Sequence, residues 1–179
     1  MKINIGKYPK GNGQRKVNIQ IDKFDTWSMD HTLAMIIYPM LLQLKETKHG
    51  VPNEIVSDIG GENYSEQQSF DFYSETYQES FDKACDRWDE ILDKMIWSFQ
   101  QIAEDTYENK YHHGEAKYDW VKTDKQFHNP LTGKMEDTFQ MVDKNPDEHW
   151  YDHVGHRLHQ ERIQEGLELF GKYFQNLWD

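Results

Sequence analysis

The chain has 179 residues, of which 36% are hydrophobic and 29% charged, and its mean hydropathy is −0.98. The aromatic content of 14% argues against disorder, because disordered segments are poor in aromatic residues. The longest apolar run, residues 33–42, has half the ~20 residues of a membrane-spanning helix, and the net charge of −12 disfavours direct nucleic-acid binding. We therefore expect a single folded domain, residues 1–179, without a membrane span.

The single cysteine, Cys85, cannot form an internal disulfide, and residues 1–13 contain no apolar signal segment. We therefore expect a reducing, cytoplasmic setting. Cys85 lies on the apolar side of a predicted helix, where we expect a buried and unreactive thiol.

The charge is unevenly distributed along the chain. Residues 1–23 hold six basic residues and one acidic residue, whereas residues 62–108 hold thirteen carboxylates and three basic residues. Such an acidic stretch is commonly a solvated helix face. The alternative is a docking surface for a basic partner, including mimicry of DNA.

The first half of the chain predicts a hairpin followed by a helix. Alternating polarity predicts an N-terminal β-hairpin within residues 1–22. Ser28 or Asp30 can cap a helix that runs to about Lys48, and its apolar residues surround the whole axis, which predicts that it is buried. Pro39 predicts a kink in this helix. Glycine and proline residues then predict a loop over residues 49–64.

The acidic stretch contains the strongest helical pattern. Residues 65–78 are polar with four aromatic residues, and we expect them to be helical. From Glu79 to about Asn109 the apolar residues lie within an arc of about 140°. Trp97 departs from this arc and projects among carboxylates, where it either packs under residues 65–78 or anchors an interface. The partner-binding candidates are therefore Trp97, Asp86, Glu90, Asp93 and Glu104.

The last third of the chain predicts a second hairpin and a final helix. Residues 114–146 contain two strand patterns around a turn, and Asn145-Pro146 is expected to cap a helix over residues 147–177. The apolar stripe of this helix comprises Ile163, Leu167, Phe170, Phe174 and Leu177. Val154 and Leu158 lie outside the stripe, so the helix either bends near Gly155 or packs its first half on a different neighbour. With the helical core at residues 28–110, the fold class is α+β, mainly α, with three long helices and small antiparallel hairpins.

One cluster of residues suggests metal chemistry. His149, His153, His156 and His159 are spaced so that neighbouring pairs on one helix could reach a metal. No HExxH or paired-cysteine motif accompanies them, and no phosphate-binding or hydrolase motif is present. We therefore expect no metal, no cofactor and no catalytic residue, and we treat the histidines as packing or surface residues.

Three segments resemble a family of small proteins of tailed bacteriophages, found in large myoviruses including cyanophages and mostly recorded as hypothetical. They are residues 21–52, 87–99 and 161–179, with WSMDHTLA, TKHG and LFGKYFQNLWD as the most specific pieces. The resemblance implies expression in the cytoplasm of an infected host cell. It provides no catalytic residue, and most of the histidine run lies outside it.

These patterns favour a non-catalytic phage accessory protein that binds a host or phage macromolecule through its acidic, aromatic-bearing surface. Three alternatives remain open. The first is a small-ligand sponge that sequesters a host defence signal, which needs a pocket with convergent basic groups. The second is a metal-dependent hydrolase that uses the residues from His149 to His159, and the third is a virion component. We expect a protein partner, and the chain can also form a homo-oligomer.

Overall fold

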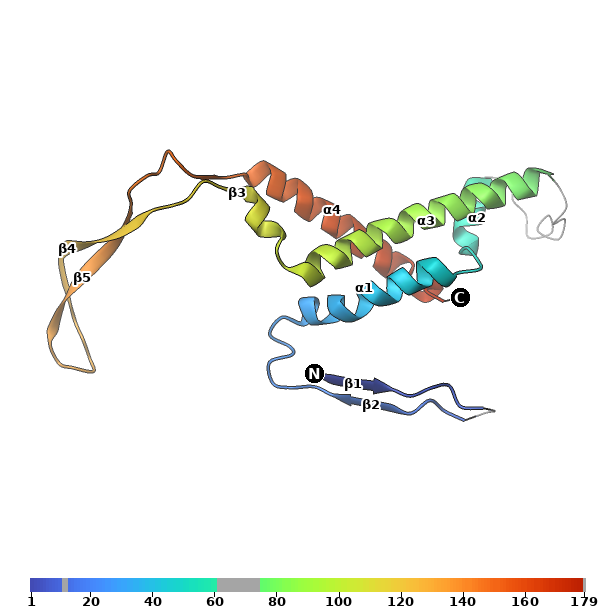
Figure 1. Ribbon diagram of the computed structural model, residues 1–179, viewed down its shortest axis with the longest axis horizontal. Helices are drawn as coiled ribbons and strands as arrows, with labels where there is room; N and C mark the ends of the chain where they lie inside the picture. Colours follow the sequence, from blue (N-terminus) through green and yellow to red (C-terminus); the bar gives the residue numbers. More distant parts are fainter. Residues whose placement is uncertain (11–12, 61–74, 179) are drawn as a thin grey trace. The chain divides into compact units, whose positions relative to one another are not determined.

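The computed structural model describes residues 1–10, 13–60 and 75–178 (Figure 1). It confirms an α+β fold that is mainly α, in which the described strands form two-stranded antiparallel sheets. The chain divides into two compact units where the sequence predicts one domain. Unit 1 comprises Met1–Asp105 and Gln160–Asp179, and unit 2 comprises Thr106–His159.

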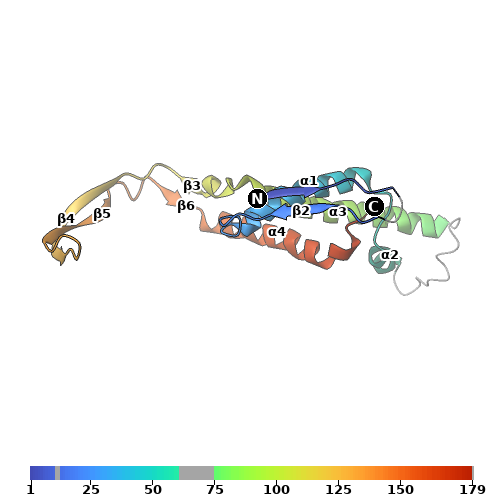
Figure 2. The same cartoon turned by 90° about the horizontal axis from the view of Figure 1, so that it is seen from below.

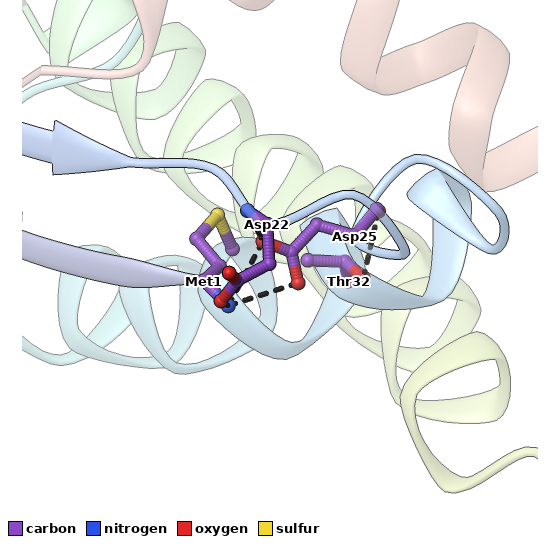
Figure 3. A network of polar contacts seen from close by, with 4 residues as sticks. All are labelled: Met1, Asp22, Asp25 and Thr32. Carbon is purple, nitrogen blue, oxygen red and sulfur yellow. Dashed lines mark hydrogen bonds and ion pairs between the residues drawn. The ribbon is translucent and has the colours of Figure 1, made fainter.

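An N-terminal ribbon opens unit 1, as the alternating pattern predicts. Strand β1 (Lys2–Ile5) pairs antiparallel with β2 (Val17–Gln20), so that Ile3 faces Ile19 and Ile5 faces Val17. The Met1 amino group lies 2.9 Å from an Asp25 carboxylate oxygen, and the Asp25 carbonyl accepts a hydrogen bond from Thr32 (Figure 3). The bond between the amino group and Asp25 raises the pKa of the amino group and lowers that of Asp25.

Helix α1 (Met29–Thr47) begins after Ser28 and continues through Pro39, close to the predicted bounds. The prediction that it is buried on all sides is wrong. Only Ala34 and Leu41 are buried, whereas Met40 is 64% exposed. The pattern shows that apolar side chains surround helix α1, but it does not show how many sides are covered. In the described chain, α3 covers only one side of α1. No described helix is long and apolar enough to cross a membrane.

A short helix, α2 (Asn53–Gly60), occupies half of the loop predicted at residues 49–64. The Ile55 amide bonds the carbonyl of Pro52, and Ile55 and Val56 are buried. Proline just before a helix and glycine at its end are boundary signals, and here they bracket a helix of only two turns. Residues 61–64, and residues 65–74 of the predicted helix, lie outside the described residues.

Helix α3 (Glu75–Glu104) carries the core of unit 1 and confirms the strongest sequence pattern. It ends before the predicted Asn109 because Asp105 adopts a left-handed φ of 48°. Figure 2 shows α3 between α1 and the C-terminal part of α4 (His153–Lys172). Its buried apolar residues are those of the predicted arc, namely Ala84, Trp88, Ile91, Leu92, Met95, Ile96 and Phe99.

The C-terminal part of α4 packs on α3 at a point of close approach. Gly166 is buried there, and the Ser98 hydroxyl donates a hydrogen bond to the Arg162 carbonyl. Ile163 is buried as its place in the stripe predicts. Phe174, in the short 3₁₀ helix η4 (Phe174–Asn176), is instead 63% exposed, because α4 ends at Lys172 and its helical period is lost there, whereas Leu177 still packs against the core.

The predicted start of the final helix at Asn145-Pro146 is wrong. The Asn145 side chain instead bonds the Lys117 amide and the Glu115 carbonyl, which ties together the base of a hairpin. Helix α4 starts only at His153, where Asp152 caps it by accepting a hydrogen bond from the Gly155 amide. Asparagine favours turns and caps alike, so its sequence position did not distinguish them.

Unit 2 contains the second predicted hairpin. Strands β4 (Tyr118–His128) and β5 (Met135–Asp143) pair antiparallel, with a register shift between Lys122 and Gln126. At the base of the hairpin, 3₁₀ helix η3 (Tyr107–Tyr111) leads into β3 (His112–His113), which pairs with β6 (Trp150–Tyr151). Most of the hairpin's apolar side chains are exposed, so unit 2 adds little to the hydrophobic core.

Candidate functional site

The five predicted partner-binding residues lie on one side of α3. At about 100° per residue, positions 86, 90, 93, 97 and 104 fall within an arc of about 60°, opposite the buried residues of the helix. The four carboxylates are exposed, and Trp97 is half-buried. We call this surface the α3 acidic face, defined by Asp86, Glu90, Asp93, Trp97 and Glu104.

Three of the four carboxylates have partners among the residues that the structure describes. Glu90 pairs with Arg87 at 2.7 Å, Asp93 pairs with Lys45 of α1 at 2.5 Å, and Glu104 accepts a hydrogen bond from Gln100. These contacts are solvent-exposed, and exposed ion pairs contribute only about 0–1 kcal/mol. The carboxylates can therefore exchange these partners for a binding partner at little cost.

Trp97 has a cation on its ring. The Arg162 guanidinium carbon, from α4, lies 3.8 Å from the centre of the indole ring. This is a close cation–π contact, within the ~6 Å at which such pairs attract. The alternative contact, with residues 65–78, concerns side chains outside the described residues. The Trp97 ring is thus half-buried, and a guanidinium already lies against one of its faces.

The histidine run does not form one helical cluster. His149 lies before β6 and its Nε2 is 2.5 Å from Asp143, whereas His153, His156 and His159 lie on α4. Burial is the largest single influence on the pKa of the Asp143 carboxyl, and by itself it raises that pKa because it favours the neutral form. The Asn145 amide and His149 outweigh it by hydrogen bonding, so the pKa of Asp143 is lowered.

Two of the α4 histidines belong to an aromatic cluster. The His159 ring stacks on Tyr107 at 4.8 Å, and the His156 ring lies 5.4 Å from Tyr111. The first half of the helix contacts these tyrosines through its histidines, whereas Val154 and Leu158, which suggested a different neighbour, are exposed. Among residues 1–10, 13–60 and 75–178, no group of three or more potential ligands is arranged to hold a metal ion.

We predict that the purified protein carries no stoichiometric transition metal. His149 is engaged with Asp143 and two of the other histidines face tyrosine rings, so a site would have to break these contacts. Elemental analysis of the intact chain tests this prediction. About one zinc per chain, lost in the His153→Ala/His156→Ala variant, would show that it is wrong.

Two hollows in unit 1 were not predicted from the sequence. The larger is a groove of about 810 Å³, called here the α1 groove. Tyr8 of the N-terminal ribbon borders it, and its other apolar lining residues are Leu33, Ile37, Met40, Leu41, Leu44, Phe170, Phe174, Leu177 and Trp178. The signal for it was the apolar surface on every side of α1, which indicates more apolar area than one neighbouring helix can cover.

The smaller hollow, of about 400 Å³, bears on the sponge alternative. Residues from the segments TKHG and LFGKYFQNLWD line it together with Trp88, and they include His49, Asn176 and Trp178. None of its described lining residues is lysine or arginine. A pocket for an anionic signal needs such groups, so this hollow does not favour a sponge.

Comparisons of the chain with models of protein families, with curated proteins and with solved structures find no match.

The cysteine thiol was predicted to be buried and unreactive, and in the structure Cys85 is half-buried. Burial raises the pKa of its thiol, and this lowers the fraction of reactive thiolate.

Proposed function

We propose that the chain is a non-catalytic accessory protein of a tailed bacteriophage that binds a basic protein in the cytoplasm of the infected host cell. The binding surface is the α3 acidic face. Its carboxylates project from a helix whose opposite side forms the core of unit 1, so the surface is held on a rigid element.

The observation that carries this proposal is the Arg162 guanidinium on the Trp97 ring. An indole ring surrounded by carboxylates combines cation–π attraction with ion pairing, which is the chemistry that selects arginine and lysine. Binding replaces Arg162 by a basic side chain of the partner. The partner's other basic groups then pair with Asp86, Glu90 and Asp93.

The carboxylates and the ring are expected to contribute differently. Exposed charges at the edge of an interface mainly speed the encounter and make it sensitive to salt. Large rings near the centre of an interface contribute most of the affinity. The two contributions can therefore be separated by mutation.

Trp97→Ala is expected to weaken partner binding by about 30-fold or more, the effect of losing a central aromatic anchor. Asp86→Asn with Asp93→Asn is expected to slow association several-fold at low salt and to flatten its salt dependence. The partner is first isolated by affinity purification from infected cells, and the association and dissociation rates are then measured with purified components.

The matched control is Asp124→Asn with Asp147→Asn, which removes the same charge from exposed positions in unit 2. It should leave the association rate unchanged. If Trp97→Ala instead unfolds at a much lower urea concentration, Trp97 has a structural role. If both Asn pairs slow association equally, the effect comes from net charge and the α3 acidic face is not the binding surface.

A further inference from the structure

The contact between Arg162 and Trp97 joins α4 to α3 at the surface of unit 1. The Arg162 guanidinium carbon lies 3.8 Å from the centre of the indole ring, and the Arg162 side chain is exposed. Trp97 belongs to the α3 acidic face, the surface at which we place the partner. The chain therefore holds one of its own cations on the ring that a basic partner would use.

The backbone of Arg162 is fixed, whereas its side chain reaches into solvent. The Arg162 carbonyl accepts a hydrogen bond from Ser98, the residue after Trp97 in α3. Ile163 is buried, and Gly166, one turn later, lies at the close approach of α4 to α3. The guanidinium can therefore leave the ring by rotation of its own side chain while α4 stays in place. Exposed side chains make such rotations within nanoseconds.

A cation that already lies on the ring competes with an incoming one. The apparent affinity of a site falls with the fraction of molecules in which the site is open. An exposed cation–π contact favours the occupied state by about 2- to 5-fold. Arg162 is thus expected to lower the affinity of the ring for an incoming cation by about the same factor.

We propose that the partner anchors itself with an arginine, and that Arg162 occupies the place of that arginine in the free chain. This inference rests on the proposed function and names the residue type that the α3 acidic face recognises. A guanidinium is planar and weakly hydrated, so it stacks on an indole ring, whereas a lysine ammonium is compact and strongly hydrated. An arginine can therefore replace the stacked guanidinium by an equivalent contact, and a lysine cannot.

A neighbouring carboxylate gives the incoming arginine a second contact. Asp93 lies one helical turn before Trp97, so the two side chains leave the same side of α3. In the free chain the Asp93 carboxylate pairs with Lys45 of α1. Hydrogen bonds between a guanidinium and a carboxylate are about twice as strong as those between neutral groups. A partner's arginine that stacks on the ring can also bind Asp93, and this second contact lets it displace Arg162.

Two capped peptides, one of six arginines and one of six lysines, test the inference on the full chain. They have the same length and charge and differ in the cation that each presents. In calorimetric titration at one fixed ionic strength, the wild type should bind the arginine peptide at least about threefold more tightly. Arg162→Gln should raise the affinity for the arginine peptide by about 2- to 5-fold. Trp97→Ala should remove the difference between the two peptides.

The matched control is Arg157→Gln, which removes the same charge from another exposed position of α4. Its effect measures the general attraction between the acidic chain and a cationic peptide, and it should be smaller than that of Arg162→Gln. Arg162→Lys keeps the charge but loses the planar group, so it should give part of the gain. Both positions are exposed, so these variants should fold, and circular dichroism checks this.

Equal affinities of the wild type for the two peptides, or no binding of either, would overturn the inference. So would a gain from Arg162→Gln no larger than that from Arg157→Gln, or an arginine preference that persists in Trp97→Ala. The partner captured from infected cells tests the proposed function separately. If Trp97→Ala and Asp86→Asn with Asp93→Asn still weaken or slow its binding, only the inference fails. If neither change affects its binding, the proposed function fails as well.

Discussion

Gly166→Ala is expected to destabilise unit 1 by several kcal/mol, although it adds only one methyl group. A Cβ at position 166 would lie 2.1 Å from the Ser98 hydroxyl and 2.6 Å from the Lys94 carbonyl oxygen. The second neighbour is backbone, so rotation of a side chain cannot relieve the clash. Helices α3 and α4 would have to separate, which exposes core residues and breaks the hydrogen bond from Ser98 to Arg162.

The matched control is Gly171→Ala in the same helix, where nothing lies within 4 Å of the added Cβ. Alanine is a better helix former than glycine, so this variant should be unchanged or more stable by up to about 1 kcal/mol. Urea unfolding followed by helical circular dichroism, at one fixed protein concentration, measures both. Equal midpoints for the two variants would mean that α3 and α4 do not approach each other at Gly166.

The contrast between these two glycines illustrates where sequence reasoning ends. Periodicity predicted the core side of α3, because a single helix determines which of its positions share a face. It did not predict the role of Gly166, which depends on how close a second helix comes. Nor did it predict the Arg162 guanidinium on Trp97, since that contact joins residues from two different helices.

Two other errors have local causes. Asn145 and Pro146 have the residue types of a helix start, but the hairpin of unit 2 uses the Asn145 side chain first. Residues 53–60 form a helix, but they were predicted to be part of a loop because glycine and proline residues surround them. In both cases the residue type was interpreted correctly as a boundary, but the element that it bounds was wrong.

The candidate site was predicted in part. The arithmetic of the helix placed Asp86, Glu90, Asp93, Trp97 and Glu104 on one side of α3, and the structure keeps them there. The sequence also showed that α1 is apolar on every side. The sequence could not show what packs against the apolar surface of α1, because the pattern of apolar residues is the same whether the neighbour belongs to this chain or to another protein.

Trp88→Ala is expected to lower the free energy of unfolding by about 3–5 kcal/mol, the usual cost of removing a buried large ring. Trp88 is 2% exposed and lies edge-on to the buried Tyr173 ring, with 5.4 Å between centroids. The change removes the packing between α3 and the end of α4. Leu41→Ala, on α1, should cost about 2–5 kcal/mol for the same reason, because Leu41 is 3% exposed.

The control for Trp88 is Trp27→Ala, because Trp27 is 86% exposed and its loss should change stability by no more than about 0.5 kcal/mol. A Trp88→Ala midpoint equal to that of the wild type would show that the phase assigned to α3 is wrong. That result would also affect the α3 acidic face, since the same phase places Trp97 and its carboxylates on the side opposite Trp88. A large loss for Trp88 with little change for Trp27 therefore supports both the core of unit 1 and the orientation of its proposed binding surface.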